Sequence, residues 1–229
     1  MRIENFDNDE IKDLIVDNDK LLLEDLQTHG LKIYQRKSHF KFGSDAVLLA
    51  NSVEVSPRGV ALDIGSGTGI VPILLAGKLG FEKVYGVEID KDTADLSKKS
   101  VELNNLQNSI TIINRPIQNI SEYLPSGSCR VVCSNPPFNK VGSGDTSTES
   151  SIAHSRFEHS LTLQDTVKAA SYLLSTGGKF YMIHQVYRLA EIMHECTVHK
   201  LEPKVLKIVD KKRFLIQCTK DGKVGLLIK

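Results

Sequence analysis

The sequence has few of the features that mark membrane, secreted or metal-binding proteins. None of its apolar runs approaches the roughly 20 residues that a membrane-spanning helix needs. The segment Met1–Asn5 lacks the apolar core of a secretion signal. The four cysteines have neither C-x-x-C spacing nor a secreted context, so we expect reduced, structural thiols and no metal site. These absences predict a cytoplasmic protein without a membrane or metal partner.

Length and composition favour one main domain. The chain has 229 residues, of which 41% are hydrophobic and 25% charged, which suits a compact enzyme with small flanking elements. We divide it into an N-terminal extension with a hairpin, residues 1–43, and a main domain, residues 44–229. We find no internal repeat.

The net charge is only +1, but it is unevenly distributed. Residues 1–30 hold nine acids and three bases, residues 31–42 hold four bases and no acid, and residues 199–229 hold nine bases and three acids. Two basic segments on one face would bind a phosphate backbone, with Lys32, Lys37, Lys211 and Lys212 as candidates. The alternative is that these lysines only solvate strands and loops.

Strands and helices alternate along the main domain, as in a doubly wound α/β fold. Such a fold binds its ligands at the carboxyl ends of its strands. The pattern predicts a mostly parallel, seven-stranded Rossmann-like sheet that ends in an antiparallel hairpin. Before it, we expect helix within residues 8–29 and a hairpin of Leu31–Tyr34 with Phe40–Phe42. The expected strands are 60–64, 83–88, 110–113, 130–134, 178–184, 203–209 and 213–218, and the expected helices are 44–52, 70–80, 92–104, 163–175 and 187–196.

A glycine-rich turn follows the first of these strands. It runs Asp63-Ile64-Gly65-Ser66-Gly67-Thr68-Gly69. The third glycine comes one residue too early for the dinucleotide pattern G-x-G-x-x-G, which disfavours a nicotinamide or flavin cofactor. S-adenosylmethionine has no pyrophosphate and needs close backbone approach to its amino-acid part. We therefore assign Asp63, Gly65, Gly67 and Gly69 to a site for this cofactor.

The next strand ends in a carboxylate. Glu88 lies 25 residues after Asp63, where an acid accepts hydrogen bonds from both ribose hydroxyls of a nucleoside cofactor. The alternative is a solvated acid at a strand end.

A second motif, Asn135-Pro136-Pro137-Phe138, closes the apolar run 131–134. An exocyclic amine is a poor nucleophile, because its lone pair is delocalised into the ring, and two acceptors on its N–H groups favour a more pyramidal nitrogen. The Asn135 side-chain carbonyl and the Pro136 backbone carbonyl are suitable acceptors, and Phe138 can stack on the base. Alone, the motif also suits an ordinary turn after a strand. With the glycine turn upstream, it predicts a methyltransferase that acts on an amino nitrogen.

The chain resembles the bacterial tRNA1(Val) (adenine-37-N6)-methyltransferases over nearly its whole length. Beyond the two motifs above, the resemblance is carried by residues 30–33, 42–50, 86–88, 103–105, 177–180 and 201–204. It implies N6-methylation of an adenine in tRNA, at the purine beside the anticodon of a valine tRNA, with S-adenosylmethionine as the methyl donor. It also implies that Asp45 lies near the methionine end of the cofactor; a helix N-terminal acid favoured by the macrodipole is the alternative.

The sequence departs from this family in three places. Pro116 stands where relatives place an acid that holds the cofactor's adenine, so we expect Asn114, Gln118 or the Ile117 amide to make that contact. The segment 139–160 is a polar, glycine-rich loop that we expect to fold over the substrate. It keeps Arg156 and Glu158 but lacks the histidine usual between them. Phe138 replaces a more frequent tyrosine, and stacking needs only the ring.

Three other functions fit parts of the pattern. Glutamine-N5 methyltransferases of release factors and guanine-N2 methyltransferases of rRNA use the same Asn-Pro-Pro-aromatic chemistry. The former normally carry a separate helical N-terminal domain, for which residues 1–59 leave little room. A non-catalytic RNA-binding protein would not need Gly65, Gly67, Gly69, Glu88 and Asn135 together.

Overall fold

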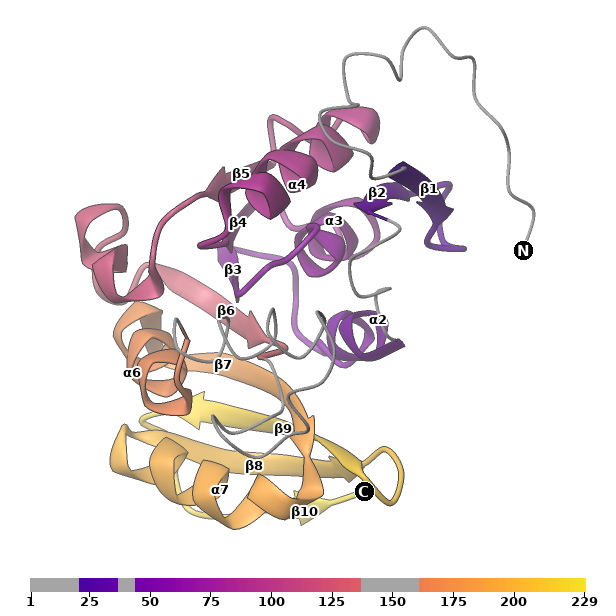
Figure 1. Ribbon diagram of the computed structural model, residues 1–229. Coiled ribbons are helices and arrows are strands. Elements are labelled where there is room, and N and C mark those ends of the chain that lie inside the picture. The colour runs from indigo at the N-terminus through magenta and orange to yellow at the C-terminus, as the bar shows by residue number, and fades with distance from the viewer. Residues whose placement is uncertain (1–20, 37–43, 137–160) are drawn as a thin grey trace, which may run out of the picture.

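An eight-stranded mixed sheet forms the centre of the computed structural model, which describes residues 21–36, 44–136 and 161–229 (Figure 1). The strand order is β10-β8-β9-β7-β6-β3-β4-β5, and the five strands from β7 to β5 are parallel. The antiparallel strand β9 lies between β7 and β8. The strands are β3 Val60–Ile64, β4 Lys83–Val87, β5 Ile110–Ile113, β6 Cys129–Ser134, β7 Leu174–Gln185, β8 Leu201–Ile208, β9 Arg213–Lys220 and β10 Leu227–Ile228.

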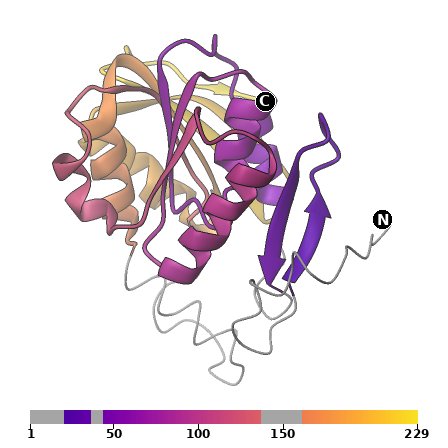
Figure 2. The same cartoon turned by 90° about the horizontal axis from the view of Figure 1, so that it is seen from above.

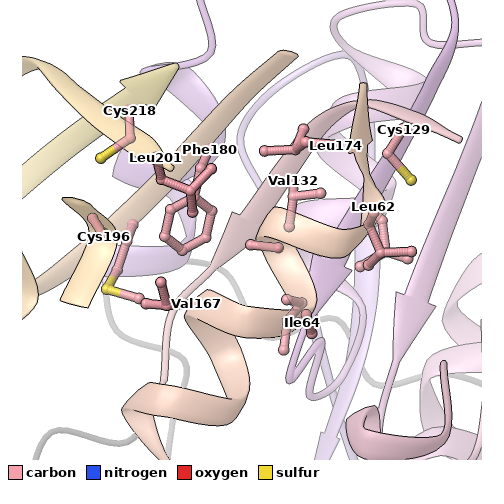
Figure 3. Packing of buried hydrophobic residues seen from close by; sticks show 14 of the residues in the cluster. Leu62, Ile64, Cys129, Val132, Val167, Leu174, Phe180, Cys196, Leu201 and Cys218 are labelled. Carbon is pink, nitrogen blue, oxygen red and sulfur yellow. The ribbon is translucent and has the colours of Figure 1, made fainter. Parts of the chain in front are cut away.

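Helices cover both faces of this sheet, as a doubly wound fold requires. The helical segments are α2 Ser44–Asn51, α3 Ile70–Gly77, α4 Lys91–Leu103, η2 Ile117–Glu122, α6 Leu163–Leu173, η3 Val186–Arg188 and α7 Leu189–Val198. Side chains alternate along each strand: Ala61 packs with residues of α2 and α3, whereas Leu62 and Ile64 pack with residues of α6. Figure 3 shows part of the hydrophobic cluster that contains Leu62 and Ile64. In it, Val167 and Cys196 approach Phe180 and Leu201.

Local signals in the sequence explain where the helices begin. Asp90 caps α4, because its side chain accepts a hydrogen bond from the Thr93 amide at 2.8 Å. Thr162 caps α6 in the same way, with the Asp165 amide at 3.1 Å. Pro72 lies within the first turn of α3, where a missing N–H costs nothing.

The N-terminal extension forms a hairpin different from the predicted one. Strand β1, Leu21–Asp25, pairs antiparallel with β2, Lys32–Arg36. The helix predicted within residues 8–29 is therefore wrong for 21–25, because pairing with β2 overrides the helical propensity of leucine and glutamate. The predicted partner segment 40–42, and residues 8–20 of the predicted helix, lie outside the described residues.

This hairpin docks on helix α4 (Figure 2). The Asn104 side chain acts as a strand partner: its Oδ1 accepts the Lys32 amide at 2.9 Å and its Nδ2 donates to the Lys32 carbonyl at 2.6 Å. The Ser100 hydroxyl accepts the Tyr34 amide at 3.0 Å. Ile33 is fully buried beneath these bonds, so polar and apolar contacts hold the hairpin on α4 together.

The strands and helices predicted within residues 44–229 agree with the structure, with one addition. All seven predicted strands and five predicted helices are present, and the bounds 60–64 and 110–113 are unchanged. The sequence reading missed β10, whose two residues pair with Val205 and Leu206 of β8. The four cysteines, Cys129, Cys133, Cys196 and Cys218, are buried free thiols, as expected. In the described ranges, no helix is both long enough and apolar enough to span a membrane.

We predict that Asn104→Ala loosens the hairpin without unfolding the sheet. The change removes the two hydrogen bonds between the Asn104 side chain and the Lys32 backbone, a cost of about 1–3 kcal/mol. Amide hydrogen exchange of residues 32–36 should become faster, while exchange in β7 stays unchanged. Asn108→Ala is the matched control, because Asn108 is exposed. Unchanged exchange in β2 would mean that apolar burial alone docks the hairpin.

Candidate active site

Four strands place the candidate site residues at one edge of the sheet. The pairs Ile64↔Val87, Ile64↔Ser134 and Val87↔Ile113 align the carboxyl ends of β3, β4, β5 and β6. Gly65, Glu88, Asn114 and Asn135 follow these ends directly. The chain leaves β3 toward β4 on one side and later returns to β6 on the other, so this edge is the switch point where open α/β sheets bind ligands.

The three glycines of the turn after β3 all adopt left-handed backbone conformations. Their φ angles are 71° at Gly65, 53° at Gly67 and 91° at Gly69, values that favour glycine over any other residue. Gly69 also lies so close to α4 that an added Cβ would come within 2.4 Å of the Ser97 hydroxyl. The turn therefore depends on glycine for both its conformation and its packing.

The Glu88 carboxylate fixes this turn to the end of β4. Its Oε2 accepts the Gly67 amide and its Oε1 accepts the Asp90 amide, each at 2.9 Å. Glu88 is 5% exposed. Burial raises its pKa, against the lowering effect of the two amide bonds. The alternative of a solvated acid at a strand end is therefore wrong.

Asp63 is a second buried acid at the same place. Its exposure is 2%, and burial together with the nearby charge of Glu88 raises its pKa well above the ordinary value. Among the described residues, neither Asp63 Oδ1 nor the Ser66 hydroxyl has a hydrogen-bond partner. Buried polar atoms are normally paired, so these two atoms suit the polar groups of a bound ligand.

Asn135 and Pro136 lie at the end of β6, beside the glycine turn. The preceding Ser134 is fully buried and its hydroxyl donates to the Ile64 carbonyl at 3.0 Å, which ties β6 to the end of β3. Pro136 is buried and Asn135 is half-buried. The structure thus brings these two predicted residues next to Asp63 and Gly65. Phe138, Arg156 and Glu158 lie outside the described residues, as does the predicted loop 139–160.

Asp45 is held by a residue that the sequence analysis did not select. It lies in the first turn of α2 and is 7% exposed. Arg213, the first residue of β9, forms an ion pair with Asp45 and binds Asp210 Oδ2 through Nη2 at 2.7 Å. Asp45 and Arg213 are 168 residues apart, and no local sequence signal links them.

The three groups predicted to contact the cofactor's adenine follow the end of β5. In the structure, two of them have other hydrogen-bond partners. The Asn114 side-chain amide donates to the carbonyls of Glu88 and Ile89, both at 2.9 Å. Gln118 Nε2 donates to Asp165 at 2.9 Å. The Ile117 side chain is buried in the core, but its backbone amide opens η2, where helical N–H groups lack intrahelical partners.

No metal centre accompanies these carboxylates in the parts of the chain that the structure describes. There, no group of three or more histidine, cysteine, aspartate or glutamate side chains is arranged to hold a metal ion.

The chain shares its fold with solved structures of methyltransferases. A predicted O-methyltransferase from Agrobacterium tumefaciens superposes with a TM-score of 0.64 at 20% identity, covering 81% of this chain and 85% of that one. TrmN from Thermus thermophilus superposes with a TM-score of 0.59 at 17% identity, over 76% of this chain and 48% of that one. At such identities the likeness establishes the fold alone.

Sequence comparison defines the family. The methyltransferase small domain model matches residues 37–205. A tRNA1(Val) (adenine(37)-N6)-methyltransferase from Trichodesmium erythraeum is 31% identical over 82% of this chain and 81% of its own length. One from Porphyromonas gingivalis is 29% identical over 70% of this chain, which spans 65% of that relative. The chain belongs to the methyltransferase small domain family and, within it, to the tRNA1(Val) (adenine(37)-N6)-methyltransferase family.

We predict that Asp63→Asn stabilises the cofactor-free protein and weakens cofactor binding. A raised carboxyl pKa means that the folded protein holds a proton which the unfolded chain has released. The stability that protonation of Asp63 contributes is therefore lost as the pH rises through the pKa of the folded state. It grows as the pH falls toward the ordinary pKa of an aspartate. At about pH 8 the variant should melt about 2–4 °C higher, the shift expected for about 1 kcal/mol.

Thermal melts of the cofactor-free protein between about pH 5 and pH 8 test this linkage. The variant should depend less on pH than the wild type, since only the wild type gains from protonation of Asp63. Asp95→Asn is the control, and its effect on the pH dependence should have the opposite sign, because two lysine partners lower the pKa of Asp95. A lower melting temperature with an unchanged pH slope would show that Asp63 carries no buried-charge cost.

Proposed function

We propose that this protein is an S-adenosylmethionine-dependent methyltransferase of tRNA that methylates N6 of an adenine, the purine beside the anticodon of a valine tRNA. The observation that carries this proposal is the placement of Asn135-Pro136 at the sheet edge that also carries Asp63 and Glu88. Two strand ends then present an amine and a methyl donor to each other. The names of the relatives support the choice of adenine and of tRNA.

The residues on the β3–β4 side fit S-adenosylmethionine, which supplies an activated methyl group when bound. A carboxylate has about four lone-pair positions, so Glu88 can accept two ribose hydroxyls besides its two amide bonds. Asp63 Oδ1 and the Ser66 hydroxyl are buried atoms in need of a partner. An added Cβ at the left-handed Gly67 would meet nothing within 4 Å, which leaves room for close backbone approach there.

Two further residues complete the proposed cofactor site. The Ile117 amide at the start of η2 is the remaining donor for the cofactor's adenine, since the amides of Asn114 and Gln118 have other partners. Asp45, proposed to lie near the methionine end, is ion-paired with Arg213. We therefore assign Asp45 an orienting role at the start of α2, in which Arg213 sets the direction of its carboxylate.

The β6 side is proposed to hold the target amine. The Asn135 side-chain carbonyl and the Pro136 backbone carbonyl each accept one N–H, which directs the nitrogen lone pair toward the methyl group. The bond from Ser134 to the Ile64 carbonyl fixes the strand immediately before these acceptors. Such positioning can lower the barrier by several kcal/mol without a general base. The stacking role of Phe138 stays a prediction from the sequence.

Methylation of total tRNA from a strain that lacks this protein tests the function directly. Incubation with S-adenosylmethionine, followed by nucleoside mass spectrometry, should produce N6-methyladenosine. The same assay on ribosomal RNA and on release factors tests the two alternative reactions, guanine-N2 methylation and glutamine-N5 methylation. N2-methylguanosine or methylated glutamine as the only product would replace the proposed substrate, and no product with any of the three would overturn the proposal.

We predict that Asn135→Ala lowers single-turnover methylation by on the order of 100 to 1,000-fold, by analogy with removal of one oxyanion-hole donor. The tRNA affinity should stay nearly constant, because the lost contact acts mainly in the transition state. Asn135→Asp is the matched variant, since it keeps an acceptor oxygen and should retain part of the rate. Methylation by the alanine variant at the wild-type rate would remove Asn135 from the reaction.

A further inference from the structure

An exposed tyrosine lies beside the strand end that carries Asn135. The pair Ser134↔Met182 aligns β6 with β7, and β7 leads directly into η3, which contains Tyr187. Tyr187 is 62% exposed, more than any other aromatic residue in the described ranges. Tyrosine rings usually bury much of their surface, so an exposed ring at the active edge suits contact with a ligand.

A backbone hydrogen bond joins the turn between β8 and β9 to η3, the segment that contains Tyr187. The Val186 amide donates to the Lys212 carbonyl at 2.8 Å. Asp210 Oδ1 shapes the turn by accepting the amides of Lys212 and Arg213 at 2.8 and 2.9 Å. The exposed residues Lys211 and Lys212 are thereby held next to Tyr187, at the same edge of the sheet.

Most charges around these lysines are already compensated. Arg213 pairs with both Asp210 and Asp45, and it holds the pKa of Asp210 below its usual value. Arg188 pairs with Glu191 at 2.8 Å. Burial lowers the pKa of His184 to about 4, so this imidazole is neutral near pH 7 and adds no charge here. In the described part of the chain, neither Lys211 nor Lys212 is in an ion pair, so both can bind an anion.

We propose that Tyr187, Lys211 and Lys212 form an RNA-binding ledge that holds the strand flanking the target adenine. This inference rests on the proposed function. An enzyme that extracts one base from a stack leaves its neighbours without a stacking partner, and the Tyr187 ring replaces that partner. The two lysines contact the adjoining phosphates. An aromatic platform beside cations is the usual arrangement for single-stranded nucleic acid.

Binding of an unmodified valine tRNA transcript to Tyr187 variants tests the ledge. Tyr187→Ala should weaken binding by about 5- to 150-fold, the equivalent of 1–3 kcal/mol for one stacked base. Tyr187→Phe should bind within about twofold of the wild type, because stacking needs the ring and not the hydroxyl. Tyr187→Leu keeps apolar bulk without a flat ring, and it should lose affinity as the alanine variant does.

Two readouts separate stacking from a structural effect. With 2-aminopurine next to the target adenine, wild type and Tyr187→Phe should quench its fluorescence, and Tyr187→Ala and Tyr187→Leu should not. Lys211→Ala and Lys212→Ala should each reduce the steepness of the log–log salt dependence by about 0.7, the value for one single-strand phosphate contact. Tyr123→Ala and Lys168→Ala are controls at exposed positions on other elements, and they should leave both readouts unchanged.

The possible results distinguish the ledge from the function on which it rests. If wild type methylates tRNA but Tyr187→Ala binds and quenches like wild type, the ledge is overturned and the function stands. Loss of affinity by Tyr187→Phe equal to that of Tyr187→Ala would also overturn stacking. If the wild type methylates no tRNA but shows the predicted pattern, the ledge stands as an RNA site and the proposed reaction fails.

Discussion

The hydrogen bonds from the Gly67 and Asp90 amides to the Glu88 carboxylate organise the whole edge of the sheet. A turn with three left-handed glycines has lost much conformational freedom on folding and gains little from side-chain packing. A charged acceptor from the next strand compensates for this loss, because hydrogen bonds to charged groups are stronger than neutral ones. The same carboxylate aligns the start of α4 with the turn. Without it, the Gly67 amide would lose its acceptor, and the turn between β3 and α3 would lose its link to the end of β4.

This arrangement places two carboxylates in a buried environment, which costs stability in the absence of a ligand. Glu88 retains its amide partners, whereas Asp63 has a buried oxygen without a partner among the described residues. Natural proteins keep such strain mainly where it serves binding. Asp45 is also buried, but an ion pair with Arg213 compensates its charge. The three acids thus differ in their partners: Asp45 is paired with a cation, Glu88 accepts backbone amides, and one Asp63 oxygen has no partner among the described residues.

The sequence predicts those parts of the structure that depend on local pattern. Apolar strands bounded by turns, such as 60–64 and 110–113, were located correctly, as was the glycine turn with Glu88 behind it. Predictions failed where distant residues decide the outcome. Residues 21–25 form a strand because β2 pairs with them, and β10 forms only because β8 offers a free edge. The ion pair of Asp45 with Arg213 depends on tertiary contact in the same way.

The strand order also separates the residues proposed to hold the methyl donor from those proposed to hold the amine. Because β4 lies on one side of β3 and β6 on the other, the acids proposed for the methyl donor follow β3 and β4. The carbonyls proposed for the amine follow β6. The carbonyl side continues through β7 toward Tyr187 and the lysine-bearing turn. The buried acid Asp45 also lies at this turn, but its charge is compensated by Arg213. The exposed cations Lys211 and Lys212 thus lie on the side proposed for the amine, so electrostatic attraction of a polyanionic substrate to that side would favour the same orientation as the topology does.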